Sequence, residues 1–234
     1  MTTSEFSNEF DVLLNSFYTQ GVFGETFSKS ELVLDEYEKS VLLTQAQEEI
    51  VKELYSGKFN GESFEKTEEL RRSLSNLIIS IRPVLWEEEE RIKLDSNSIL
   101  YEYPDGAWFI LYEQATITDS SLCNGESIVK VVPIRYDEWQ FVKNNPFKKP
   151  NKNKVIRLDR ASRVLELISQ YPITDYIITY LSAPSPIILT DLPEELSING
   201  QYEETECSLN SALHRVILER AVQLAYRRFP QASK

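Results

Sequence analysis

The spacing of apolar residues in the first third of the chain has the period of an α-helix. A first helix is expected to begin at Ser4, whose hydroxyl can cap it, and to stop before the turn residues Gly21 and Gly24. Its apolar residues recur every three or four positions, as expected for one buried face: Phe6, Phe10, Leu13, Leu14 and Phe17.

A second helix is predicted from Ser28 to Tyr55. Ser28 and Glu31 have the spacing of a capping box, and Gly57 suits the left-handed conformation that often ends a helix. One face repeats about every four residues: Leu34, Tyr37, Val41, Ala46, Ile50 and Leu54. The apolar positions of a third helix follow Ser63: Leu70, Leu74 and Leu77.

The second helix carries more apolar residues than one stripe requires. Residues 32–34 and residues 41–43 are each a run of three apolar residues. Only one residue of each run, Leu34 and Val41, belongs to the repeating face. Such a helix is either sandwiched within its own subunit or partly buried against a neighbouring molecule. The sequence favours neither interpretation.

From Ile81 onward the pattern changes to the alternation of β-strands. Residues 99–103 and 108–112 both alternate, and the Pro-Asp-Gly at 104–106 between them is typical of a hairpin turn. Further strands are expected at 115–119, 127–135, 154–158, 173–181 and 186–189, with a short helix at about 161–170. Residues 143–154 are polar, basic and twice interrupted by Pro, which predicts an exposed loop.

The chain returns to a helical pattern near Ser208 and is expected to leave it before Pro230. Its apolar stripe is Leu209, Leu213, Val216, Ile217, Ala221 and Leu224. Helices followed by strands and a last helix indicate an α+β fold. We expect a helical bundle formed by residues 1–80 with residues 205–230. Residues 81–204 are then an inserted strand-rich region, β-sandwich or barrel-like, with a basic loop at 143–154.

Charge is distributed unevenly along this chain of net charge −12. Residues 1–90 hold 19 acidic and 8 basic residues, whereas residues 143–163 hold 8 basic and 1 acidic. A chain this acidic is not expected to bind nucleic acid with its whole surface, because DNA affinity rests on neutralising phosphates. The basic stretch remains a candidate contact.

The candidate partner-binding residues are the lysines of the basic loop: Lys148, Lys149, Lys152 and Lys154. Phe147 lies beside them, and an aromatic ring among lysines can stack on single-stranded nucleic acid. One Phe without a periodic partner favours a solvated loop or a loop that faces a protein partner. Nucleic-acid contact stays open as the alternative.

No pattern of catalytic, metal-binding or cofactor-binding residues is expected. His214 is the only histidine, and its spacing from Cys207 matches no zinc or calcium pattern, so a helix-face or interface role is favoured. Residues 87–90 are four consecutive Glu, whose mutual repulsion favours a solvated face over a pair of catalytic carboxylates. With seven glycines, the chain has no phosphate-binding or nucleophile-elbow motif.

Cys123 and Cys207 are the only cysteines. We expect both to be small buried hydrophobic residues, although the sequence leaves a disulfide between them open. No run approaches the roughly 18 apolar residues that span a bilayer, and the first residues lack the pattern of a signal peptide. A soluble protein that is used in a cytosol, or in a particle assembled there, is expected.

Four segments, in this order along the chain, resemble the head–tail connector proteins of crAss-like phages. The first is the helix 37–47, and the second is 145–150 followed by 155–158. The third is the strand pair 176–181 and 184–189, and the fourth is 206–209 with 214–221. The resemblance covers the chain from about residue 30 to residue 226.

This resemblance implies a virion structural subunit, in about twelve copies, that forms a homo-oligomeric ring below the portal. It further implies contacts with an adjacent ring or the tail, passage of DNA without sequence-specific binding, and no catalytic residues. Two hypotheses accompany it. The acidic first third lines the DNA conduit, since carboxylates repel phosphates, and the basic loop docks on an acidic partner.

Two other functions are kept as alternatives. One is a soluble binding module whose strand-rich region recognises a peptide or small ligand and has no virion role. The other is an enzyme with a carboxylate site that matches none of the common motifs.

Overall fold

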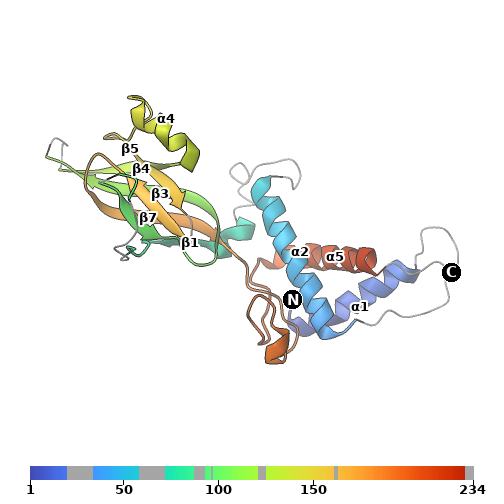
Figure 1. The fold of residues 1–234 in the computed structure, drawn as a ribbon. Coiled ribbons are helices and arrows are strands. Elements are labelled where there is room, and N and C mark those ends of the chain that lie inside the picture. The colour runs from blue at the N-terminus through green and yellow to red at the C-terminus, as the bar shows by residue number, and fades with distance from the viewer. Residues whose placement is uncertain are drawn as a thin grey trace. The chain divides into compact units, whose positions relative to one another are not determined.

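A computed structural model describes residues 1–19, 34–57, 72–86, 93–95, 97–120, 125–160 and 163–229. The chain forms two units, each with its own core (Figure 1). The helical unit comprises Met1–Leu77 and Ala183–Lys234, and the sheet unit comprises Ile78–Ser182. The expected α+β class is confirmed.

In the helical unit, α5 (Ser211–Arg228) lies beside both α1 (Thr3–Thr19) and α2 (Glu36–Ser56). The apolar stripes expected from the sequence supply much of its core. The buried residues on these helices include Phe6, Phe10, Leu14, Ala46, Ile50, Leu54, Leu213, Ile217 and Ala221. Along the described residues, no helix is long and apolar enough to cross a membrane.

The helix starts differ from the expected ones. The backbone N–H of Thr2 donates to Glu5 Oε2 at 2.9 Å and Thr2 Oγ1 accepts from the Glu5 N–H at 3.3 Å, so Thr2, not Ser4, caps α1. Asp35 is extended and forms a capping box with Glu38. The helix α2 therefore begins at Glu36, whereas the sequence predicted one continuous helix from Ser28. The predicted end at Gly57 is confirmed, with φ +69°.

Several expectations lie outside the described residues. These are the Ser28–Glu31 capping box, the apolar Leu32 and Val33, the start of the third helix at Ser63, the acidic run 87–90, and Cys123. Residues 72–74 are helical, and the 3₁₀ turn η1 (Ser75–Leu77) follows them before the first strand.

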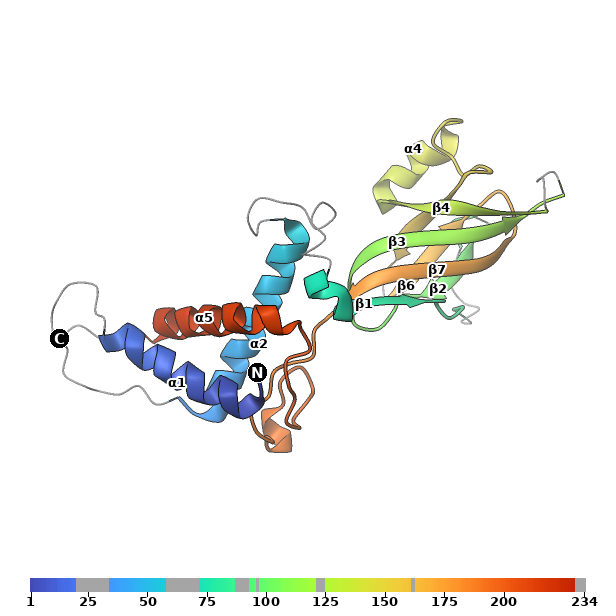
Figure 2. The same ribbon diagram turned by 180° about the vertical axis from the view of Figure 1, so that it is seen from behind.

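The sheet unit holds one seven-stranded sheet of order β1-β7-β3-β4-β5-β6-β2 (Figures 1 and 2). The strands are β1 (Ile78–Ile81), β2 (Ile99–Glu102), β3 (Ala107–Thr118), β4 (Glu126–Ile134), β5 (Lys154–Arg160), β6 (Val164–Ile168) and β7 (Ile173–Ser182). Neighbours are antiparallel except β4 and β5. That parallel pair requires a crossover, made by η2 (Tyr136–Glu138) and α4 (Trp139–Asn144).

The sheet curls so that the chain after β1 reaches the opposite edge. The Glu102 N–H donates to the Val84 carbonyl at 2.8 Å, and the Trp86 N–H donates to the Leu100 carbonyl at 3.0 Å. Leu85 and Tyr101 form the antiparallel bridge between these bonds. Residues 84–86 therefore pair with β2, the edge strand farthest from β1, and cover backbone groups that would otherwise form an open edge.

Two expectations about the strands are wrong. Gly106 has φ +70° in the expected turn, but β2 pairs with β6 and β3 pairs with β4 and β7, so no hairpin forms there. Within the helix expected at about 161–170, residues Val164–Ile168 form β6 instead, and every residue of β6 is buried. A short apolar run flanked by sheet neighbours fits a buried strand as well as a helix, and its pairing with β2 and β5 decides between them.

Instead of the strand expected at 186–189, this segment forms only an isolated bridge at Ile188. It lies in the helical unit and is bonded mainly to α2. Ser40 Oγ accepts from the Leu189 N–H at 3.0 Å, and Gln47 Nε2 donates to the Ser185 carbonyl at 2.8 Å. Between them, Thr44 Oγ1 accepts from the Ile187 N–H at 3.1 Å and donates to the Ile187 carbonyl. We call these three α2 residues the polar ladder.

The ladder matches two different repeats. Residues 40, 44 and 47 share one helix face, and alternate residues of an extended chain present backbone groups to one side. The rise along the helix from residue 40 to residue 47 is about 10.5 Å, and four residues of extended chain, as from 185 to 189, span about 13 Å. The two lengths are similar, so the three side chains can reach successive backbone groups of the segment. The other side of the extended segment is satisfied by Ile188, which exchanges two backbone bonds of 3.0 Å with Thr205.

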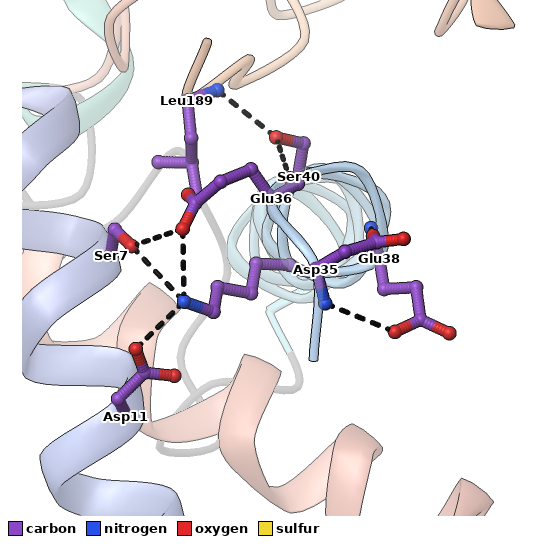
Figure 3. Close-up of polar contacts among 8 residues, drawn as sticks. Ser7, Asp11, Asp35, Glu36, Glu38, Ser40 and Leu189 are labelled. Carbon is purple, nitrogen blue, oxygen red and sulfur yellow. Dashed lines mark hydrogen bonds and ion pairs between the residues drawn. The ribbon is translucent and has the colours of Figure 1, made fainter. Parts of the chain in front are cut away.

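A second polar cluster joins α1 to the start of α2. Lys39 Nζ lies 2.7 Å from Asp11 Oδ2, 3.1 Å from Glu36 Oε1 and 3.1 Å from Ser7 Oγ. Figure 3 shows Ser7 and Asp11 on α1 facing Glu36, with Ser40 bonded to Leu189 nearby. Burial disfavours the Lys39 ammonium, but its hydrogen bonds and ion pairs with Asp11 and Glu36 outweigh this and raise its pKa.

Thr44→Val keeps the shape of the side chain but removes the hydroxyl. The buried N–H and C=O of Ile187 then lose this hydrogen-bonding partner. We expect the free energy of unfolding to fall by about 1–3 kcal/mol, measured by urea denaturation with circular dichroism. Thr174→Val, on an exposed strand position, is the control and should change it by less than about 0.5 kcal/mol. Equal effects of the two substitutions would contradict the ladder's role.

Lys39→Met removes the charge that Asp11 and Glu36 share, and we expect a loss of about 1–3 kcal/mol of unfolding free energy. Lys52→Met is the matched control, since Lys52 pairs with Glu48 on the same helix but its side chain is 52% exposed. That pair should contribute only about 0.3–0.5 kcal/mol. A Lys39→Met protein as stable as the Lys52→Met protein would show that the cluster does not join the helices.

Candidate functional site

An apolar groove lies between α4 and the face of β4 and β5 that α4 covers. It encloses about 430 Å³ and remains open to the surface. Its apolar walls are Val132, Ile134, Phe141, Val142 and Ile156. Its polar margin is Glu138, Asn145, Lys148 and Lys154. We call this feature the lysine-rimmed groove.

The crossover from β4 to β5 creates the groove. Trp139 and Val142 are buried with Ile156, Leu158 and Ile168 and fix α4 against the sheet. The opposite, enclosed face of the sheet holds a separate core that includes Val129, Val131, Val155, Leu165 and Leu167. Alternation along β4 and β5 thus supplies a core on one face and a groove wall on the other.

Exposed aromatic residues flank this region. The Phe141 side chain is 80% exposed and Phe147 is 88% exposed. An apolar groove with exposed rings beside it is unusual for a surface that stays in water, and such patches mark interaction sites.

The structure brings two of the four candidate lysines to the groove. Lys148 is exposed at the rim. Lys154 also lines the groove, and its Nζ donates to the Phe147 carbonyl at 3.2 Å, a hydrogen bond that helps to hold the loop. Lys149 is half-buried and Lys152 is exposed, and neither lines the groove. The expected exposed loop holds for most of 143–154, although α4 extends to Asn144 and β5 begins at Lys154.

Short-range hydrogen bonds fold the lysine loop. Asn145 Oδ1 accepts from the Phe147 N–H at 3.0 Å, and the Asn145 carbonyl accepts from the N–H groups of Lys148 and Lys149. Asn151 exchanges two backbone bonds of 3.1 Å with Lys154. Asn side chains commonly stabilise turns in this way. The rim is therefore preformed.

The lysines are evident in the sequence, whereas the apolar wall is not. The available signal was Phe141 beside Trp139 and Val142, because Trp139 and Val142 occupy the buried side of α4 and Phe141 does not. A six-residue helix is too short for that periodicity to be read from sequence alone.

His214 lies on α5 with its side chain buried. Its Nε2 lies 3.1 Å from the Leu209 carbonyl, its Nδ1 lies 2.8 Å from the Met1 nitrogen, and its ring packs on Phe6 at 5.4 Å between centroids. Burial is the main cause that lowers the pKa of His214. The imidazole is thus used in packing on α5, in line with the helix-face interpretation.

A buried ion pair stands on the enclosed face of the sheet. Arg157 Nη1 lies 2.5 Å from Glu113 Oε2, and the Tyr176 hydroxyl donates to Glu113 Oε1 at 2.5 Å. Burial, together with the Glu113 charge, raises the pKa of Tyr176. The side chains are 7% and 5% exposed for Arg157 and Glu113, so the network is closed to a substrate and its role is in the core.

Across the described part of the chain, no three His, Cys, Asp or Glu side chains are grouped to hold a metal ion. Cys207 is a free, half-buried thiol whose Sγ donates to Gln47 Oε1 at 3.3 Å. Burial raises the pKa of Cys207 to about 11. Gln47, a member of the polar ladder, therefore also contacts the segment that returns to α5.

The raised pKa predicts that the Cys207 thiol reacts slowly with an alkylating reagent. In a Cys123→Ser protein at pH 8, Cys207 should react with iodoacetamide at least about 10-fold slower in the folded state than in urea. Its thiolate fraction is roughly 100-fold lower, and the greater nucleophilicity of a more basic thiolate offsets only part of this. The rate should rise as the pH approaches 11. Equal rates in the folded and unfolded protein would contradict the burial of this thiol.

Comparison with known proteins gives matches over nearly the whole chain. A family model described as phage tail ring protein 3/4 matches residues 1–233. Ring protein 3 of Bacteroides phage crAss001 is 47% identical over 228 residues, which cover 96% of this chain and 95% of that protein. Ring protein 4/5 of the same phage is 36% identical over 235 residues, covering 96% of this chain and 92% of that protein.

Proposed function

Because the chain belongs to the phage tail ring protein 3/4 family, we propose that it is a structural subunit of a ring in a crAss-like phage particle. The observation that carries this proposal is the 47% identity to Ring protein 3, which extends over both the helical and the sheet unit. The whole chain, rather than one unit of it, is then the ring-forming element.

The finer proposal is a closed homo-oligomer of about twelve copies that connects the portal to the tail and is assembled in the host cytoplasm. A closed ring joins one face of each subunit to a different face of the next, so each subunit needs two complementary surfaces. The two units supply contrasting charge. Among the described residues, the helical unit holds 16 acidic and 7 basic residues, and the sheet unit holds 11 and 12.

We further propose that carboxylates of the helical unit border the path of the DNA. Phosphates are repelled by such a surface, so DNA passes without sequence-specific binding. The protein then acts without catalysis, cofactor or metal. Its function is to hold neighbours in register.

Quantitative mass spectrometry of purified particles tests the proposal. We expect this chain at a fixed, low copy number relative to the portal protein, and the same ratio after the particles are purified again. An abundant host cytoplasmic protein, whose amount should fall with each purification, is the control. Particles that are complete and infectious but contain none of this chain would refute the proposed role.

A further inference from the structure

We propose that the lysine-rimmed groove of one subunit receives an acidic segment, residues 191–206, from a second copy of this chain. This inference rests on the proposed function, because a homo-oligomeric ring places another copy beside every groove. We call residues 191–206 the acidic strap. It belongs to the helical unit, whereas the groove belongs to the sheet unit.

The strap has the composition that the groove calls for. Its 16 residues contain six acidic residues and no basic one. Leu196, at the end of the 3₁₀ turn η3 (Glu194–Leu196), and Tyr202 are each 42% exposed. Glu195 and Glu203, next to these two residues, are exposed as well. Apolar side chains thus stand among carboxylates on one short segment.

The groove presents the complementary arrangement. Its wall is apolar and includes the largely exposed Phe141, and the two basic residues Lys148 and Lys154 line its rim. Its volume of about 430 Å³ lies in the range of sites that bury most of a small ligand, which is room for more than one side chain. An apolar residue can enter the groove while flanking carboxylates pair with the rim lysines.

The strap is already folded within its own subunit. Ile188, Leu192 and Ile198 form a buried cluster against Tyr37 and Val41 of α2. Backbone bonds close the segment on itself, with the Leu192 N–H donating to the Tyr202 carbonyl at 2.7 Å. A preformed segment loses little conformational entropy on binding, so most of its contact energy contributes to affinity.

Charge favours this occupant over nucleic acid. Phosphates would meet the lysines, but apart from Phe141 the wall of the groove is aliphatic, and its margin carries the carboxylate of Glu138. Stacking on bases requires a row of aromatic faces along a basic channel. A segment that combines carboxylates with Leu and Tyr satisfies both the wall and the rim.

Cysteine cross-linking tests the proposal directly. All variants carry Cys123→Ser and Cys207→Ser, and two single-cysteine proteins, Val132→Cys in the groove wall and Leu196→Cys in the strap, are mixed. A disulfide between them can only join two different copies. The control mixture pairs Leu196→Cys with Thr174→Cys, an exposed position of the same sheet unit. We expect the 132–196 dimer to form at least about 10-fold faster than the 174–196 dimer.

Charge reversal gives a second test of the same contact. Lys148→Glu should slow the 132–196 cross-link roughly five-fold, and Glu195→Lys on the partner copy should restore the rate. Lys152→Glu is the matched control, because it makes the same charge change in the same loop away from the groove. Restoration by the swapped pair distinguishes a direct contact from damage to the fold.

Both reactions are run with the full-length protein and with particles that carry the variants. No cross-link above the control in either setting overturns the inference. So does a disulfide that forms only within one chain when both cysteines are placed together. A Lys148→Glu protein with unchanged cross-linking but reduced retention on single-stranded DNA would assign the groove to nucleic acid instead. If the chain is present in particles while the cross-link fails, only the docking is wrong and the ring role stands.

Discussion

The helical unit depends on three polar side chains in the middle of an otherwise apolar helix face. Ser40, Thr44 and Gln47 are buried, and each bonds the backbone of residues 185–189 where the chain returns from the sheet. Buried backbone groups must be satisfied, and here a helix does so where a neighbouring strand ordinarily would. The return path, the acidic strap that follows it and the approach to α5 are all fixed by this contact.

The sheet unit follows a different constraint, namely the parallel pairing of β4 and β5. Parallel neighbours cannot be joined by a tight turn, so the connection crosses one face of the sheet and leaves α4 upon it. The short helix covers Ile156, Leu158 and Ile168 but not the whole face. The gap that remains between α4 and this face is the lysine-rimmed groove. A topological requirement thus produces the surface that we assign to a neighbouring subunit.

The sequence predicted features that depend on local chemistry and missed those that depend on partners far along the chain. The helical stripes, the end at Gly57 and most strands were predictable, because period and cap residues are local. The family resemblance was confirmed by matches over nearly the whole chain. Neither the strand β6 nor the absence of a hairpin at Gly106 was predictable, because both depend on the pairing of β2 with β6. Likewise the lysines were evident, whereas Phe141 required the position of α4.

We propose that this chain builds a ring through contacts between unlike faces of its two units. A cryo-EM reconstruction of the phage tail at side-chain resolution measures this directly. We expect a closed ring of this chain in which residues 191–206 of each subunit occupy the lysine-rimmed groove of the next. A ring in which every groove faces solvent, or a tail with no density for this chain, would contradict it.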